Sequence, residues 1–302
     1  MPPVFIFKVD VDTDKGTQVG VPNLVRLFKK HQVAASFFFS LGPDNTGKQI
    51  RRLFQPGFFK KVSRTNVLKL YGLRTLLYGT LLKAPQIAKN HAATLQQVKA
   101  EGFEVGLHCY DHFEWQDYLH DMTQQEVIEE YQKGIAIFKT VFGSLPLGTA
   151  APGWQTNAYS LQVYDDLDLL YSSDTRGFMP FFPSIEGQSF RTLQLPTTLP
   201  ALDELLGNPA YPESKINEHY LELLQSDYPN IHTIHAEIEG MSKQDLLEDL
   251  IVKLKASNVE FLSLEAYARR CLQNSDAIPF CQLVQKPFEG RAGALACQGS
   301  IC

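Results

Sequence analysis

The sequence predicts an α/β fold built on a parallel sheet or barrel. Short apolar segments typical of buried strands alternate with amphipathic segments typical of helices over most of the chain. Hydrophobic residues make up 44% of the 302 residues and charged residues 20%, as in folded globular proteins. This length allows one large domain or two small ones, because α/β barrels often reach it as a single unit.

The strands are expected where apolar residues run together. The first, from Val4 to Val9, is broken only by Lys8. Later strands are expected at residues 34–39, 103–107, 169–172, 192–195, 231–235 and 259–262.

The helices are expected from apolar spacing and from capping residues. Apolar side chains at helical spacing occupy Val21, Leu24, Val25, Leu27 and Phe28. Thr123 followed by Glu126 is a capping box, which predicts the start of a long helix. Ser242 and Ser263 each resemble the N-cap of the helix that follows.

The two ends of the chain lack some familiar signals. From about Asn274 the periodicity fades, so we expect one domain over residues 1–273 and an irregular tail over 274–302. The N-terminus lacks the features of a signal peptide, and no run of 18 apolar residues predicts a spanning helix. We therefore expect a cytoplasmic protein. The net charge of −5 argues against nucleic-acid binding by the protein as a whole.

One segment interrupts the alternation of strands and helices. From Asn45 to Ala100 the chain contains no Asp or Glu, while Lys and Arg residues are interleaved with aromatic residues and leucines. We expect an insertion at about 45–90 that lies on an anionic membrane, where each basic residue contributes roughly 1 kcal/mol. A solvated face or a disordered loop is the alternative. The residues expected to contact lipid are Phe58, Phe59, Lys60, Lys61, Arg64 and Arg74.

The strongest local motif contains two histidines, His108 and His112, directly after a predicted strand. Residues four apart lie on one face of a helical turn, so both imidazoles could reach one ion. Two unrelated polar residues at a strand exit are the alternative. Loops after parallel strands are where the active sites of barrels collect, which favours the metal site.

Two aspartates, Asp10 and Asp12, follow the first apolar strand. Period-2 alternation puts both on the same side of the chain. A hydrolytic metal site needs an anionic ligand and a base for the attacking water, and these residues could supply one of each. A helix or turn cap is the alternative. Late in the chain, His232 and His235 have opposite parity, and His235 at the end of its strand is the better candidate for the site.

This order of motifs resembles the polysaccharide deacetylases, also called NodB-type carbohydrate esterases, from about Val4 to Leu272. The resemblance implies a distorted, partly open (β/α)-barrel and a divalent cofactor, whether zinc, manganese, cobalt or nickel. It implies that Asp10 is the catalytic base and His235 the general acid. It also implies that Asp12, His108 and His112 bind the metal.

Other positions match the family less completely. The family's Arg-x-Pro motif corresponds to Ala150-Ala-Pro152, so the arginine that steadies the base is missing. The resemblance assigns the substrate pocket to Pro152, Gly153, Trp154 and Asp174, with Arg176 near Asp174. Trp154 could equally be a core aromatic.

Several details resemble one branch of the family, including Val-Asp-Val-Asp-Thr, Ala-Ala-Pro-Gly-Trp and Ile-His-Ala-Glu-Ile-Glu-Gly. They imply removal of a formyl group from an amino sugar linked to undecaprenyl phosphate. They also imply a peripheral location on the cytoplasmic side of a bacterial inner membrane and a role in lipid A modification and polymyxin resistance. Deacetylation of another N-acyl sugar or glycan is the alternative.

Three other classes share part of this pattern. A haloacid-dehalogenase-type phosphatase would place Thr or Val where Asp14 stands, and would leave His108 and His112 without a role. A glycosyltransferase would require a nucleotide, and we expect no nucleotide cofactor. A catalytically silent, membrane-binding relative is the third, suggested by the missing arginine.

Overall fold

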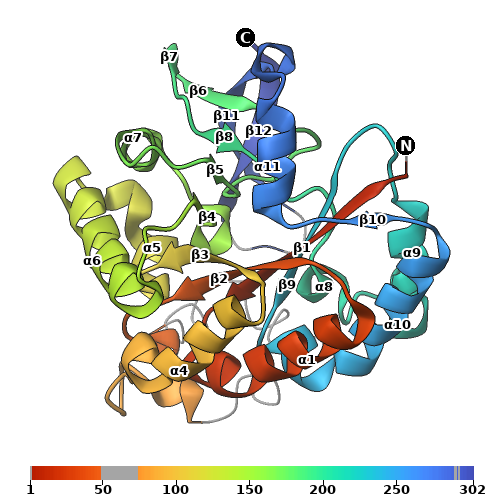
Figure 1. Ribbon diagram of the computed structural model, residues 1–302. Helices are drawn as coiled ribbons and strands as arrows, with labels where there is room; N and C mark the ends of the chain where they lie inside the picture. Colours follow the sequence, from red (N-terminus) through yellow and green to blue (C-terminus); the bar gives the residue numbers. More distant parts are fainter. Residues whose placement is uncertain (1, 49–73, 289–290, 292) are drawn as a thin grey trace.

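The centre of the molecule is a parallel sheet that curls into a partly open barrel (Figure 1). The computed structural model describes residues 2–48, 74–288, 291 and 293–302. The strands of this sheet are β1 (Val4–Val11), β2 (Ala35–Ser40), β3 (Glu104–Cys109), β4 (Gly148–Thr149), β5 (Tyr171–Ser172), β8 (Leu193–Gln194), β9 (Asn230–His235) and β10 (Glu260–Phe261). Their order is β10-β1-β2-β3-β4-β5-β8, with β9 also paired to β1, and the pairings are parallel. The predicted α/β fold is confirmed.

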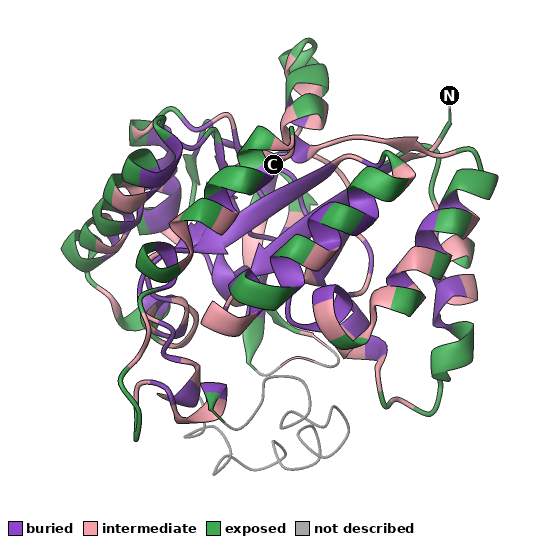
Figure 2. Cartoon of the chain, turned by 60° about the horizontal axis from the view of Figure 1, so that its bottom comes forward, coloured by how far each residue is buried: buried purple, intermediate pink, exposed green. Residues whose placement is uncertain are grey.

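The helices surround the sheet, and their outer faces are exposed while the strands are buried (Figures 1 and 2). They are α1 (Val21–His31), α4 (Ile87–Ala100), α5 (His112–Tyr118), α6 (Gln124–Phe142), α7 (Ala158–Asp166), α8 (Leu202–Leu205), α9 (Ile216–Glu222), α10 (Gln244–Ala256) and α11 (Leu264–Leu272). Thr123 and Ser263 cap α6 and α11 as predicted. The prediction for Ser242 is wrong, because a π-helical turn extends over Ile238–Ser242 and α10 begins at Gln244 after Lys243.

Strand β1 separates two cores by its alternation. Phe5, Phe7, Val9 and Val11 point outward and pack with the surrounding helices in the larger core. Ile6 points into the barrel, where it packs in a smaller apolar cluster. The other buried members of that cluster are Phe38, Ala150, Tyr171, Leu193, Leu195, Ile231, Leu264 and Ala268. Residues 8, 10 and 12 share the inward parity of Ile6, so β1 directs three charged side chains into the barrel.

The C-terminal segment forms regular structure, so the predicted irregular tail is wrong. Strands β11 (Phe280–Pro287) and β12 (Ala294–Ile301) join β6 (Phe182–Ile185) and β7 (Gln188–Ser189) in a second sheet of order β12-β11-β6-β7. This sheet lies in the upper part of Figure 1. Leu295 and Cys297 pack on Trp154, whereas most of β11 is exposed or half-buried. The strands therefore show little of the apolar alternation that sequence analysis detects.

The basic insertion leaves and rejoins the barrel at neighbouring points after β2. The backbone N–H of Asp44 donates to Pro85 O at 2.9 Å, and that of Ile87 donates to Gly42 O at 2.9 Å. Arg74 is exposed. The other residues predicted to contact lipid, which are Phe58, Phe59, Lys60, Lys61 and Arg64, lie outside the described residues. Within the described part of the chain, no helix has the length and apolar character needed to cross a membrane.

Candidate metal centre and active site

Three side chains predicted to bind a metal converge at the carboxyl ends of the strands. Asp12 follows β1, His108 lies in β3 and His112 is the first residue of α5. His108 Nε2 lies 3.3 Å from Asp12 Oδ1, and His112 Nε2 lies 3.5 Å from Asp12 Oδ2. One ligand atom from each residue lies within 4.8 Å of the other two. One carboxylate and two imidazoles are a donor set that suits zinc and other late divalent ions.

The protonation state of Asp12 also fits a cation site. Burial alone would raise the pKa of Asp12, but the neighbouring His112 and His108 lower it well below its usual value. Asp12 Oδ1 is buried and accepts no hydrogen bond from any residue that the structure describes. A buried, ionised oxygen of this kind is stabilised by a cation. We conclude that the residues present fit a divalent metal ion.

The two histidines meet through a different local structure from the one predicted. His108 is still in the strand, and the chain turns at Tyr110 and Asp111 before α5 begins at His112. Asp111 caps that helix, because its Oδ1 accepts from the N–H of Phe113 at 3.1 Å and of Glu114 at 3.2 Å. The predicted helical turn across both histidines is therefore wrong. Their rings nevertheless lie 5.3 Å apart between centroids.

The predicted base and acid lie side by side at the same edge of the sheet. Asp10 and His235 are register partners in the pairing of β1 with β9. Asp10 Oδ1 is buried 4.0 Å from His108 Nδ1, without a hydrogen-bond partner among the described residues. Burial by itself would lower the pKa of His235, but the carboxylates of Asp203, Asp12, Glu239 and Asp10 raise it overall. A histidine that holds its proton more tightly is suited to act as an acid.

His232 faces the opposite side of β9, as its parity predicts. Its ring packs against Tyr220 at 4.5 Å between centroids and against Phe5 and Phe7 at 6.2 Å. Burial lowers the pKa of His232 to about 3, which keeps the ring neutral. His232 is thus a core histidine, and only His235 of this pair reaches the site.

Two buried glutamates brace the backbone of the site. Glu237 Oε1 accepts from the N–H of Asp12 at 3.1 Å, and from both the N–H (2.9 Å) and the Oγ1 (2.8 Å) of Thr13. Glu239 Oε2 accepts from the N–H of His235 at 2.9 Å. Burial raises the pKa of Glu237 to about 8 and that of Glu239 to about 7. These contacts fix the strand exits that carry a metal ligand and the acid.

Asp203 is a residue of the site that the sequence analysis missed. It lies in α8, and its charge is the largest of the contributions that raise the pKa of His235. Arg291, from the connection between β11 and β12, donates to Asp203 Oδ1 at 2.7 Å and to Glu204 Oε1 at 2.8 Å. No local motif marks this arrangement, because it depends on contacts between distant segments.

The four residues predicted for the substrate pocket are partly or fully buried. Trp154 is 2% exposed, and its Nε1 donates to Thr197 Oγ1 at 3.0 Å. Asp174 is fully buried, and its Oδ1 accepts from the N–H of Ala151 at 2.6 Å. Pro152 is buried and Gly153 half-buried in the turn at Pro152–Trp154. Arg176 pairs with Glu204 at 3.0 Å, so its ion pair is not with Asp174. A contact of these residues with a sugar remains a prediction.

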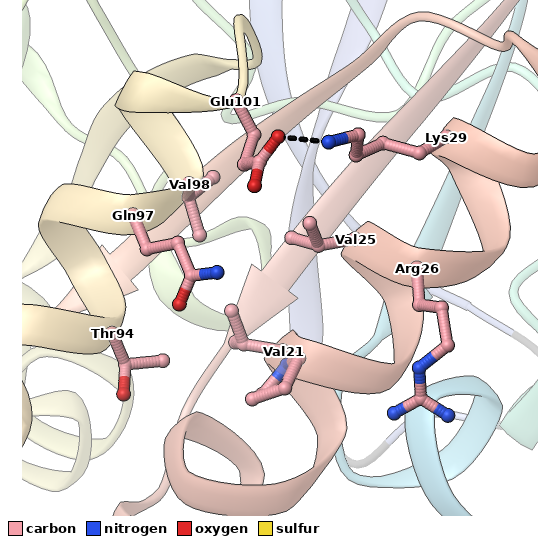
Figure 3. A pocket seen from close by; sticks show the side chains of 9 residues that line it. Val21, Val25, Arg26, Lys29, Thr94, Gln97, Val98 and Glu101 are labelled. Carbon is pink, nitrogen blue, oxygen red and sulfur yellow. Dashed lines mark hydrogen bonds and ion pairs between the residues drawn. The ribbon is translucent and has the colours of Figure 1, made fainter.

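An open groove on the outside of the barrel is separate from this site. It lies between α1 and α4, where Val21, Val25 and Val98 line it and an ion pair joins Lys29 to Glu101 (Figure 3). None of the candidate metal ligands lines it. The groove follows from the packing of two helices and carries no chemistry of its own.

Comparison with known proteins finds similar sequences and similar folds over most of the chain. Residues 11–172 match the model of the family described as polysaccharide deacetylase. A protein of Shewanella sediminis named as a probable 4-deoxy-4-formamido-L-arabinose-phosphoundecaprenol deformylase is 37% identical over 97% of this chain and 94% of its own. A protein of the same name from Wigglesworthia glossinidia brevipalpis is 33% identical over 95% of this chain and 99% of its own. The crystal structure of a probable polysaccharide deacetylase from Pseudomonas aeruginosa shares the fold, with a TM-score of 0.62, 15% identity, and coverage of 90% of this chain and 92% of that one.

Proposed function

Because the chain belongs to the polysaccharide deacetylase family, we propose that it is a metal-dependent amide hydrolase. Its substrate in this proposal is 4-deoxy-4-formamido-L-arabinose linked to undecaprenyl phosphate, and the free aminoarabinose lipid that it releases serves lipid A modification. The observation that carries the proposal is the convergence of Asp12, His108 and His112 beside Asp10 and His235. The names of the two relatives support the formyl group and the lipid carrier.

The reaction follows from the positions of the side chains. A divalent ion held by Asp12, His108 and His112 would supply Lewis acidity, which lowers the pKa of water toward about 7. Asp10 accepts the proton of the water that attacks the formamide carbon. His235 donates a proton to the departing nitrogen, because an unprotonated amide anion is a very poor leaving group. The C–N bond breaks, and the products are formate and the amine.

The test is formate release from the formamidoarabinose lipid, measured before and after chelation. We expect turnover to fall by at least about 10²-fold when the metal is removed, since it supplies most of the electrostatic stabilisation. Zinc, manganese, cobalt or nickel, added back singly, should restore it. The matched substrate carries an acetyl group in place of the formyl group. Full turnover by protein shown to be free of metal would contradict the proposal, and preference for the acetyl substrate would favour deacetylation of another N-acyl sugar.

We further propose that the basic insertion holds the protein on an anionic membrane surface. The insertion leaves the barrel after β2, at the same edge of the sheet as the metal ligands. Asn45 Nδ2 donates to Asp111 Oδ2 at 2.6 Å, next to His112, and Lys48 pairs with Glu114 at 3.0 Å. Leu81 in the described part of the insertion is 82% exposed. An insertion bound to lipid would bring a lipid-linked sugar close to the site.

Vesicle sedimentation tests this membrane proposal. Binding to vesicles with anionic lipid should weaken as salt is raised, and the triple variant Lys60→Glu, Lys61→Glu, Arg64→Glu should bind at least about tenfold more weakly. The control is a second triple variant, which changes the net charge by the same amount but on α10 and α11. It carries Lys253→Glu, Lys255→Glu and Arg269→Glu. Binding that ignores both salt and the reversals in the insertion would refute the proposal.

A further inference from the structure

A lysine occupies the interior of the barrel directly below the candidate base. Lys8 lies on the inward face of β1, between the apolar residue Ile6 and the carboxylate of Asp10, and it is 0% exposed. A buried ammonium group is strongly destabilising unless it has an ionic partner and hydrogen bonds. The position of Lys8 therefore requires an explanation beyond packing, because an aliphatic side chain would fill this space at lower free energy.

The contacts of Lys8 identify its partners. Its Nζ donates to Ser173 O at 2.8 Å and lies 3.7 Å from Asp10 Oδ2. Burial lowers the pKa of Lys8, and the charges of Asp10 and then Asp174 oppose that effect. Lys8 Nζ also lies 5.5 Å from the centroid of the Trp154 ring. The carboxylate of Asp10 is thus the ion-pair partner of Lys8, and the charge of Asp174 also acts on it.

The two oxygens of Asp10 have different neighbours. Oδ1 faces His108 Nδ1 at 4.0 Å and is close to the candidate metal ligands, whereas Oδ2 faces Lys8. Ala150 stands where the family resemblance predicts an arginine, and it is fully buried in the smaller apolar cluster inside the barrel. No cation can reach Asp10 from that position. Lys8 supplies one from the strand of Asp10 itself, two residues earlier.

We propose that Lys8 is the positioning residue for Asp10: its ammonium group holds Oδ2, so that Oδ1 is directed toward the water at the metal site. This inference rests on the proposed function, because it assigns Lys8 a role through the base of that reaction. It also accounts for the missing arginine, since Lys8 supplies the positive charge from β1 and not from the segment after β4. Lys8 touches no reacting atom in this arrangement.

The first test compares Lys8→Met with Lys8→Arg. Methionine keeps the unbranched shape without the charge, whereas arginine keeps the charge. We expect Lys8→Met to lower kcat for formate release by about 10- to 100-fold, as is usual when a group that orients a catalytic residue is lost. KM should stay within about threefold and the bound metal should stay stoichiometric. Lys8→Arg should have most of the wild-type kcat, because it keeps the charge. If Lys8 only filled space with its methylene chain, Lys8→Met would not lower kcat.

The second test distinguishes an effect of Lys8 on Asp10 from an effect on Asp174. If Lys8→Met folds poorly in the wild-type background, the Asp174→Asn background still allows the effect of Lys8 on kcat to be measured. In an Asp174→Asn background, one buried negative charge is removed, so the loss of Lys8 leaves less uncompensated charge. A double-mutant cycle compares Lys8→Met in both backgrounds. If Lys8 acts through Asp10, the same fold-loss in kcat appears in each. If the loss disappears in the Asp174→Asn background, Lys8 serves Asp174 and the inference is wrong.

The outcomes for the two proposals are distinct. A wild-type protein that releases no formate in the presence of metal rejects the proposed function. An active wild type, together with Lys8→Met of unchanged kcat, rejects the role of Lys8 alone.

Discussion

Asp10→Asn is expected to lower kcat for formate release by about 10³-fold while the bound metal is retained. Asparagine has the shape of the aspartate but cannot accept the proton of the attacking water, and a positioned general base typically contributes 10²- to 10⁴-fold. The metal should remain, because the candidate ligands are Asp12, His108 and His112. The measurements are steady-state kinetics on the formamido lipid and metal analysis of the same preparation.

Asp14→Asn is a suitable control for the loss of one negative charge at this edge of the sheet. Asp14 Oδ1 accepts from His91 Nε2 at 2.8 Å and from Asn90 Nδ2 at 3.1 Å, so it is occupied outside the site. Its kcat should stay within a few-fold of wild type. Unchanged turnover in Asp10→Asn would show that another group takes the proton.

The sequence was sufficient to predict those parts of the site that depend on local geometry. Residues of the same parity in a strand share a face, so Asp10 and Asp12 could be placed together and His232 could be separated from His235. Parallel strands end at one edge of a sheet, so residues more than a hundred positions apart could be assigned to one site. The turn between His108 and His112 was not predicted. Asp111 caps α5, so this helix begins only at His112.

The parts that the sequence did not predict depend on contacts between distant segments. In the sequence, Lys8 appears only as an interruption of an apolar run. The structure shows that Lys8 is buried inside the curled sheet and pairs with Asp10. Asp203 acts on His235 from α8 through its charge, and it pairs with Arg291 from the connection between β11 and β12. The sequence analysis also missed that sheet, since β11 and β12 bury few apolar side chains; β11 pairs with both β12 and β6.

His108→Gln is expected to abolish both metal retention and turnover. Catalytic metal sites of this type use three protein ligands, and the loss of one leaves Asp12 and His112 as a much weaker pair. Turnover should fall by at least about 10³-fold, because the Lewis acidity and the alignment of the water are lost together. Metal analysis after dialysis and formate release are the direct measurements.

His232→Gln is the matched control, because His232 is an equally buried histidine on a parallel strand that faces the other core. It should lower the free energy of unfolding but leave metal stoichiometry and kcat close to wild type. Added metal at 100 times its Kd should stabilise the wild type and His232→Gln by about 2.7 kcal/mol and raise both melting temperatures. Added metal should leave the melting temperature of His108→Gln unchanged. If His108→Gln still gained thermal stability from metal and still released formate, the ion would have to bind elsewhere, and the convergence of Asp12, His108 and His112 would not be the active site.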